Sequence, residues 1–271
     1  MSGSPDSGLE PPHVSPEEYD EDYYRTACAG HDEWVASGGA GQAGLYKGIL
    51  RRSGLAEGMT VCDIGAGRGE LVALAAEHGA KRAIGVEYSR AAVALSAQSI
   101  SQRGVADRAM VVLADARRLP LPSGCVDLVF MIDVIEHLAP AELAATFAEG
   151  HRVLRAGGRL FAHTFPTRTI YDVTYRAMRA GARLTGRSWP ADPRNDYEHR
   201  MHVNEQTRRG LHRSLQVAGF PKPDVRFGEW VHTDFVPSER ARRAYHALAK
   251  HRLTAPLATA DLWVDATKAT R

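Results

Sequence analysis

The chain is poor in cysteine and in long apolar runs. Its 271 residues include three cysteines, Cys28, Cys62 and Cys125, far apart in the sequence. An odd number with no metal-type spacing argues against a disulfide framework, so we expect reduced cysteines in the core or beside a ligand, as in a cytoplasmic protein. No apolar run reaches ~18 residues, which predicts no membrane span and no membrane partner.

Lys and Arg are absent from residues 1–22, which carry seven acidic residues. This start is also rich in Pro and Ser and unlike a secretory signal, so we expect residues 1–18 to be a disordered acidic tail. Residues 151–215 show the reverse, with thirteen Arg against five acidic residues. The net charge is nevertheless only +2, and no Lys/Arg-rich run or RNA-binding module is visible, which argues against a nucleic-acid partner.

From residue 59 onward, apolar runs alternate with helical patterns. Strands are predicted at 59–65, 81–88, 109–115, 125–133, 158–165, 223–231 and 260–268. Helices are predicted at 70–80, 89–104 (capped by Ser89), 140–155 and 204–220 (capped by Asn204), with a short helix in VIEHL. Such alternation implies right-handed crossovers and a parallel sheet covered on both faces, and therefore an α/β fold.

The segment 166–204 interrupts this regularity. It carries Tyr171, Tyr175, Trp189 and Tyr197, many Arg and no clear strand. A segment of this length is too long for an ordinary loop, which predicts a functional lid or a small cap.

The stretch VCDIGAGRGEL places Gly65, Gly67 and Gly69 at the end of the first strand. Ligands of parallel α/β sheets bind beyond the carboxyl ends of the strands, and glycines there allow close contact between backbone and ligand. The dinucleotide fingerprint requires a glycine where this chain has Glu70. A carboxylate at the helix start would repel a pyrophosphate, which disfavours NAD and suits a ligand with an ammonium group.

Polar groups follow the next three strands as well. Glu87 can accept hydrogen bonds from two ribose hydroxyls, and Asp115 with the Ala116 N–H can pair with an adenine edge. Asp133 ends the fourth strand beside the glycine loop. These strand ends together predict a nucleoside-containing ligand.

Four motifs in order, VCDIGAGRGEL, IGVEYS, LADARRLPLPSGCVDLVFMIDVIEHL and RVLRAGGRLF, resemble the class I S-adenosylmethionine-dependent methyltransferases of the small-molecule type. The resemblance covers about residues 57–165 and implies a Rossmann-like, seven-stranded, mostly parallel sheet. It implies an N-terminal helical lid at 19–56 and a methyltransferase domain at 57–271, with a substrate cap at 166–204. The implied S-adenosylmethionine site comprises Tyr24, Asp63, Gly65, Ala66, Gly67, Glu87, Tyr88, Asp115, Ala116, Asp133 and Val134.

Two histidines are candidate general bases for an acceptor hydroxyl or amine. His137 follows the fourth strand and His163 lies near the carboxyl end of the fifth. A purely structural role stays open for both, and His199 and His202 of the cap are weaker candidates.

A divalent cation such as Mg²⁺ is a further possibility, although we do not favour it. Asp133, Glu136 and His137 would share one face of a helix, and two carboxylates with an imidazole could hold a cation. The spacing resembles the E-x-x-E-H pattern of ubiquinone-pathway O-methyltransferases and of small-RNA-end methyltransferases, with Asp in the first position. Many metal-free methyltransferases carry the same pattern.

The resemblance and the polar, aromatic cap favour O- or N-methylation of a small molecule in specialised or natural-product metabolism. The basic cap suggests a negatively charged acceptor, or only a solvated face. Metal-assisted methyl transfer and a non-catalytic nucleotide-cofactor-binding protein remain alternatives. An oxidoreductase is disfavoured, because Tyr171 is followed four residues later by Tyr175 rather than by Lys. The number of subunits stays open.

Overall fold

The computed structural model describes residues 9–28, 30–40, 43–184, 186–228, 239–251 and 253–270. Seven strands form one sheet in the order β3-β2-β1-β4-β5-β7-β6, in which only β7 runs antiparallel to its neighbours. The strands are β1 (Thr60–Ile64), β2 (Arg82–Glu87), β3 (Ala109–Leu113), β4 (Val126–Ile132), β5 (Leu154–Thr164), β6 (Asp224–Phe227) and β7 (Leu262–Thr267). The predicted Rossmann-like sheet is confirmed, although residues 229–231 of the predicted sixth strand lie outside the described ranges.

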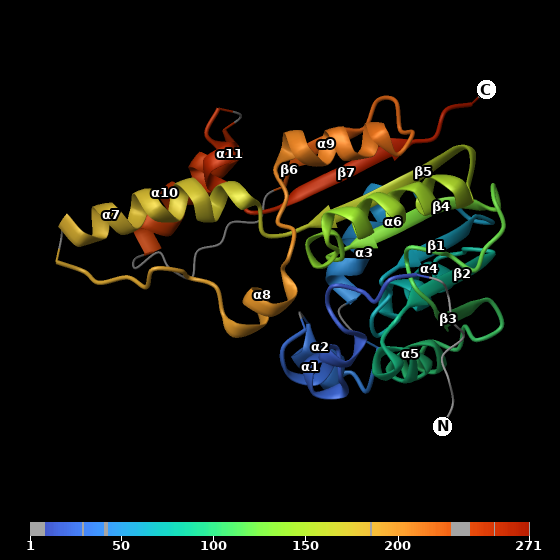
Figure 1. Cartoon of the computed structure of the whole chain (residues 1–271). Coiled ribbons are helices and arrows are strands. Elements are labelled where there is room, and N and C mark those ends of the chain that lie inside the picture. Colours follow the sequence, from blue (N-terminus) through green and yellow to red (C-terminus); the bar gives the residue numbers. More distant parts are fainter. Residues whose placement is uncertain are drawn as a thin grey trace.

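Helices cover the sheet and extend beyond it (Figure 1). The α-helices are α1 (Glu21–Thr26), α2 (His31–Ala36), α3 (Ala43–Ser53), α4 (Glu70–Glu77), α5 (Arg90–Gln102), α6 (Pro140–Val153), α7 (Arg176–Leu184), α8 (Asp196–Met201), α9 (Arg208–Val217), α10 (Glu239–Lys250) and α11 (Ala255–Ala258). Short turns of other helix types are η1 (Pro16–Glu18), η2 (Ile135–His137) and η3 (Ile170–Tyr175). Among these ranges, no helix combines the length and the apolar character needed to cross a membrane.

Alternation along the strands supplies two apolar cores, one on each face of the sheet. In β4, Val129 and Met131 pack with α6 and α9, whereas Leu128 and Phe130 face α3 and α4. The strands are therefore fixed from both sides, which holds their carboxyl ends in register for the site.

Local signals set the helix boundaries. Ser89 caps α5 by accepting a hydrogen bond from the Ala92 N–H, as predicted. The predicted Asn204 cap of α9 is wrong. Thr207 caps that helix instead, while the Asn204 side chain donates to the Leu138 carbonyl at 2.9 Å.

The beginning of the chain lies over the sheet rather than trailing away from it. Val14 is buried and the His13 N–H donates to the Glu142 carboxylate at 2.8 Å, so the expected disorder is wrong for residues 9–18. Val14 shares an apolar cluster with Tyr24 of α1 and with Met201 of α8. The N-terminal segment and the cap thus meet above the carboxyl ends of the strands.

The interrupting segment 166–204 contains η3, α7 and α8 and no strand among its described residues. The two ends of this segment pack against different parts of the molecule. The α8 end packs against the N-terminal helices, whereas α7 lies beside α10 and α11, away from the sheet (Figure 1).

Candidate active site

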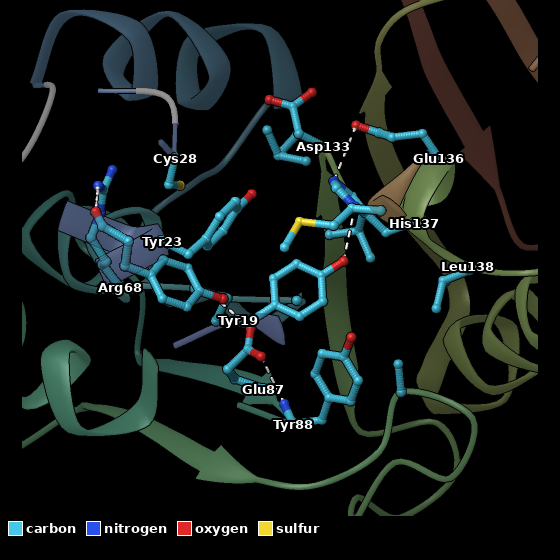
Figure 2. Close-up of a pocket in the computed structure, with 18 of the residues that line it drawn as sticks. Tyr19, Tyr23, Cys28, Arg68, Glu87, Tyr88, Asp133, Glu136, His137 and Leu138 are labelled. Atoms are coloured by element: carbon cyan, nitrogen blue, oxygen red, sulfur yellow. Dashed lines mark hydrogen bonds and ion pairs between the residues drawn. The ribbon is translucent and has the colours of Figure 1, made fainter. Parts of the chain in front are cut away.

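A cavity of about 630 Å³ lies between the carboxyl ends of β1 to β4, the N-terminal segment and α8. This volume is typical of a small-molecule site. Every residue predicted for cofactor binding lines it: Tyr24, Asp63, Gly65, Ala66, Gly67, Glu87, Tyr88, Asp115, Ala116, Asp133 and Val134. Figure 2 shows the tyrosines, Glu87, Asp133 and His137 arranged around the same space.

The glycine loop requires residues without a side chain. Gly65 has φ +74°, and a Cβ there would lie 2.4 Å from a Val134 methyl carbon. Gly67 has φ +51°, and its N–H donates to the Glu87 carboxylate at 2.9 Å. The loop is thereby held open against the end of β2.

Two buried carboxylates face this loop. Glu87 also accepts hydrogen bonds from the Tyr88 and Ser89 N–H groups, both at 2.9 Å, although burial raises its pKa. Burial, and then the Glu87 charge, raise the pKa of Asp63 to about 8. Asp63 is thus protonated at neutral pH, and a cationic group in the cavity would favour its ionised form.

The Asp115 carboxylate is held at the edge of the cavity by Arg117. It accepts from the Arg117 N–H at 2.8 Å and from Nη2 at 2.7 Å. The carboxylate is oriented beside Ala116, as an adenine-recognition pair requires.

Glu70 does not repel an anionic ligand in the way that the sequence predicted. Glu70 does line the cavity, but the guanidinium of buried Arg68 neutralises it at 2.9 Å. Arg68 also donates to the Tyr24 carbonyl at 2.7 Å. The pair therefore ties helix α1 to the glycine loop rather than presenting a negative charge to a ligand.

Tyr19 and His137 form a hydrogen-bonded pair on the wall of the cavity, with 2.9 Å between Tyr19 Oη and His137 Nδ1 (Figure 2). Burial and then the proximity of His202 lower the pKa of His137 to about 3. Burial raises the pKa of the Tyr19 hydroxyl. At neutral pH, the un-ionised phenol of Tyr19 accordingly donates a hydrogen bond to the neutral imidazole of His137.

His163 does not lie among the cavity-lining residues, contrary to its prediction as a base. Its Nδ1 lies 2.5 Å from Asp133 Oδ1 and its Nε2 lies 3.3 Å from Asp261 Oδ2. Burial opposes the charged imidazole, but the two carboxylates outweigh burial and raise the pKa of His163 to about 10. His163 is charged and fixes Asp133, whose φ of 54° is rare for a residue other than glycine.

Glu136 and His137 gather with His202 rather than with Asp133. One ligand atom from each of these three side chains lies within 4.8 Å of the others. Glu136 accepts from the Thr164 hydroxyl at 2.7 Å, and His202 Nδ1 is buried without a hydrogen-bond partner. The sequence suggested Asp133, Glu136 and His137 as a possible, not favoured, metal set; in the structure His202 of the cap takes the place of Asp133 in this group.

The cap contributes residues that sequence reasoning ranked low or missed. Tyr197, Met201 and His202 line the cavity, as do Tyr19 and Tyr23 of the N-terminal segment. None of the cavity-lining residues in the cap is an arginine, and Arg194 instead pairs with Asp192 and Glu205. The basic composition of the segment therefore gives no direct evidence for an anionic acceptor.

The three cysteines are all free, as expected. Cys28 lines the cavity and Cys62 is buried in the core, whereas Cys125 is exposed and fits neither expected location.

Residues 62–162 match the family described as methyltransferase domain. The chain is 25% identical over 187 residues to the ubiquinone/menaquinone biosynthesis C-methyltransferase UbiE of Stutzerimonas stutzeri, covering 64% of this chain and 69% of that protein. It is 26% identical over 128 residues to the sterol 4-C-methyltransferase strm-1 of Caenorhabditis elegans, covering 47% of this chain and 37% of that protein.

A similar solved structure is the Haemonchus contortus phosphoethanolamine N-methyltransferase 2 in complex with phosphomonomethylethanolamine and S-adenosylhomocysteine. Its TM-score is 0.62 at 17% identity, covering 95% of this chain and 61% of that one. The chain therefore spans less than two thirds of this protein and of the sterol enzyme.

The sheet, the glycine loop and these matches define a methyltransferase. More particularly, the chain is an S-adenosylmethionine-dependent methyltransferase with the class I fold, and S-adenosylmethionine is its cofactor.

Proposed function

We propose that this enzyme transfers the methyl group of S-adenosylmethionine to an oxygen or nitrogen atom of a small molecule. The observation that best supports this proposal is the hydrogen-bonded pair of Tyr19 and His137. The pair lies in the same cavity as all the predicted cofactor residues. A general base beside an activated methyl donor assists methylation of a hydroxyl or an amine, because it takes up the acceptor proton.

The positions of the cavity carboxylates define the proposed cofactor pose. Asp63 accepts from the cofactor ammonium, Glu87 from the ribose hydroxyls, and Asp115 with the Ala116 N–H pairs with adenine. This pose directs the sulfonium toward Asp133 and Val134 at the end of β4. The pose explains why the cavity buries Asp63 and Glu87 without a basic side chain paired to either in the described structure.

The acceptor would occupy the space beneath α8, where Tyr19, Tyr23 and Tyr197 face the cavity. In the transfer step, the methyl–sulfur bond breaks as the methyl–oxygen or methyl–nitrogen bond forms, which leaves S-adenosylhomocysteine. The acceptor proton passes to Tyr19 Oη as the Tyr19 proton moves to His137 Nδ1. Enclosure by the N-terminal segment and the cap excludes water and aligns the reactants.

Similarity to the named enzymes leaves the acceptor atom open, because two are named as C-methyltransferases and one as an N-methyltransferase. We favour O- or N-methylation because a base is present. A polar and aromatic acceptor of specialised metabolism fits the tyrosine-lined cavity better than a long isoprenoid chain does.

The test is transfer of labelled methyl groups from S-adenosylmethionine into a host lysate that is then split into small-molecule and macromolecular fractions. Label in the small-molecule fraction, absent with a Tyr19→Phe/His137→Asn variant, is the expected result. Label confined to RNA or protein would contradict the proposal. Tight cofactor binding without any transfer would favour the non-catalytic binding protein instead.

A second candidate is metal-assisted methyl transfer, favoured by the Glu136, His137 and His202 cluster. The donor set fits a divalent cation, because one carboxylate and two imidazoles kept neutral by burial are common ligands. Thr164 would orient Glu136 and Tyr19 would orient His137 through their hydrogen bonds. A bound cation would act as a Lewis acid that acidifies the acceptor.

Calorimetric titration of the metal-free protein with Mg²⁺, Mn²⁺ and Zn²⁺ tests this candidate directly. Binding at one site, weakened ~10–100-fold by His202→Ala, would support it. His199→Ala is the matched control, since His199 lies in α8, three residues before the C-cap His202, and outside the cluster. No heat of binding with any of the three ions would exclude the candidate.

A further inference from the structure

Two segments outside the active site concentrate positive charge. Residues 176–187 and 239–258, here called the outer helices, contain nine basic residues and a single acidic one, Glu239. Their formal charge is therefore +8, whereas the whole chain carries +2 and its remainder −6. The basic residues are Arg176, Arg179, Arg183, Arg187, Arg240, Arg242, Arg243 and Lys250, together with Arg252, which lies outside the described residues.

The fold brings the two segments together. Met178 of α7 packs against Tyr245 and Ala249 of α10 and Ala258 of α11. The Thr174 hydroxyl, just before α7, donates to the Leu257 carbonyl at 2.6 Å. Figure 1 shows these helices side by side and away from the sheet, so their charges belong to one projecting body.

This positive charge has no role in the cavity. No cavity-lining residue comes from the outer helices, and Arg176, Arg183, Arg240 and Lys250 are exposed. Glu239, the single acidic residue of these segments, pairs with Arg243 at 3.3 Å, and the formal charge of the segments is +8 with that pair counted. An anionic partner would offset the mutual repulsion of these groups.

Apolar side chains on the same body indicate the kind of partner. Leu184 is 90% exposed and Leu253 72%, while Leu248 and Leu257 are each 47% exposed. Aliphatic side chains among cations suit the boundary between lipid headgroups and acyl chains. Single-stranded nucleic acids, in contrast, stack on exposed aromatic rings, and Tyr245 of α10 is buried.

We propose that the outer helices dock this enzyme on an anionic lipid bilayer. Their arginines would lie among the lipid phosphates, and the exposed leucines would enter the upper acyl region. Such docking is peripheral and needs no spanning helix, so it departs from the expectation of no membrane partner, which rested on the lack of long apolar runs. It goes beyond methyl transfer and does not depend on the identity of the acceptor.

Vesicle sedimentation of the full chain tests the docking. In ~0.1 M salt, vesicles of phosphatidylglycerol and phosphatidylcholine should bind the protein at least ~10-fold more tightly than pure phosphatidylcholine does, and ~0.5 M salt should abolish the difference. The double variant R183E/R187E should lose at least ~10-fold in affinity for the anionic vesicles. The matched control R209E/R213E changes two exposed arginines of α9 by the same charge and should bind as the unmodified protein does.

The apolar contribution has its own control. Leu184→Ser should weaken binding to anionic vesicles, whereas Val217→Ser, which alters an 81% exposed residue of α9, should not. Equal binding to neutral and anionic vesicles would overturn the proposal, as would equal losses in the two charge-reversal variants. Absence of vesicle binding, with or without tight binding to an RNA oligonucleotide, would also overturn it.

Discussion

Single carboxylates carry the proposed recognition of the cofactor. Glu87 is 4% exposed and already accepts three backbone hydrogen bonds, so its position is fixed before any ligand arrives. We expect Glu87→Ala to weaken S-adenosylmethionine binding by ~1–3 kcal/mol, the typical cost of losing hydrogen bonds to a charged group. Calorimetry would measure it, with exposed Glu57→Ala as control. Unchanged affinity would contradict the ribose assignment.

Protonation of Asp63 gives the site a pH dependence. Because the pKa of Asp63 is about 8 in the free protein, the carboxyl is protonated at pH 6–7. The cofactor ammonium favours the ionised form, so binding should release about one proton and tighten as pH rises toward 8. Calorimetry at pH 7 in buffers of different ionisation enthalpy would count the protons. Asp63→Asn should abolish the release, and an unchanged release in that variant would assign the proton elsewhere.

Removal of the proposed base should lower the turnover rate rather than the affinity for the cofactor. Tyr19→Phe and His137→Asn should each lower kcat by ~10²–10⁴-fold, while the Kd for S-adenosylmethionine changes little. Steady-state kinetics with the acceptor identified from the lysate, together with calorimetry, would separate the two effects. His212→Asn on α9 is the control. Normal kcat in both site variants would remove the pair from the mechanism.

Helix α1 depends on a buried ion pair for its attachment to the sheet. Arg68 is 3% exposed, pairs with Glu70 and holds the Tyr24 carbonyl of α1. Arg68→Ala would remove the guanidinium that pairs with the buried Glu70 carboxylate, so we expect a loss of ~3–5 kcal/mol in the free energy of unfolding.

Urea unfolding of Arg68→Ala and of the double variant Arg68→Met/Glu70→Leu would check this expectation. The double variant should recover most of the stability, because it removes both charges and keeps the side-chain volume. If the double variant is as unstable as the single one, packing against Trp34 rather than charge pairing holds the helix.

The sequence predicted those elements that carry their own signals. Each strand of the parallel half is an apolar run, and each strand-end carboxylate follows directly, so both could be located without a structure. Helices α10 and α11 were missed, because their Ala- and Arg-rich sequence gives no clear apolar stripe. The cap of α9 was misplaced by three residues, because Asn204 and Thr207 are both good caps and tertiary contact to Leu138 chooses between them.

Contacts between distant segments were beyond sequence reasoning. Tyr19 and His137 are 118 residues apart, and no local pattern connects them. His163 was predicted to be a base. The sequence does not show that Asp261, 98 residues further on, lies beside its imidazole and stabilises the charged form. The cavity-lining residues at the strand ends were therefore predictable from local motifs, whereas the side of the cavity assigned to the acceptor, which is assembled from three remote segments, was not.

At the scale of the whole molecule, two segments that are remote in sequence close the site. The N-terminal segment and α8 share one apolar cluster above the sheet, and the cavity lies beneath it. A ligand enclosed there should stabilise both the N-terminal segment and α8 against local opening. We therefore expect S-adenosylmethionine, at about 100 times its Kd, to slow amide hydrogen exchange by up to ~100-fold in both Glu21–Thr26 and Asp196–Met201.

Hydrogen-exchange mass spectrometry with and without cofactor would measure this protection. Helix α9 (Arg208–Val217) serves as an internal reference, because it packs on the sheet and takes no part in the cavity. In Asp63→Asn, which should bind the cofactor weakly, protection of both segments should fall together. Protection of α1 alone would mean that the cofactor closes only the N-terminal side and that α8 responds to the acceptor, whereas protection of neither would leave the cavity open to solvent during cofactor binding.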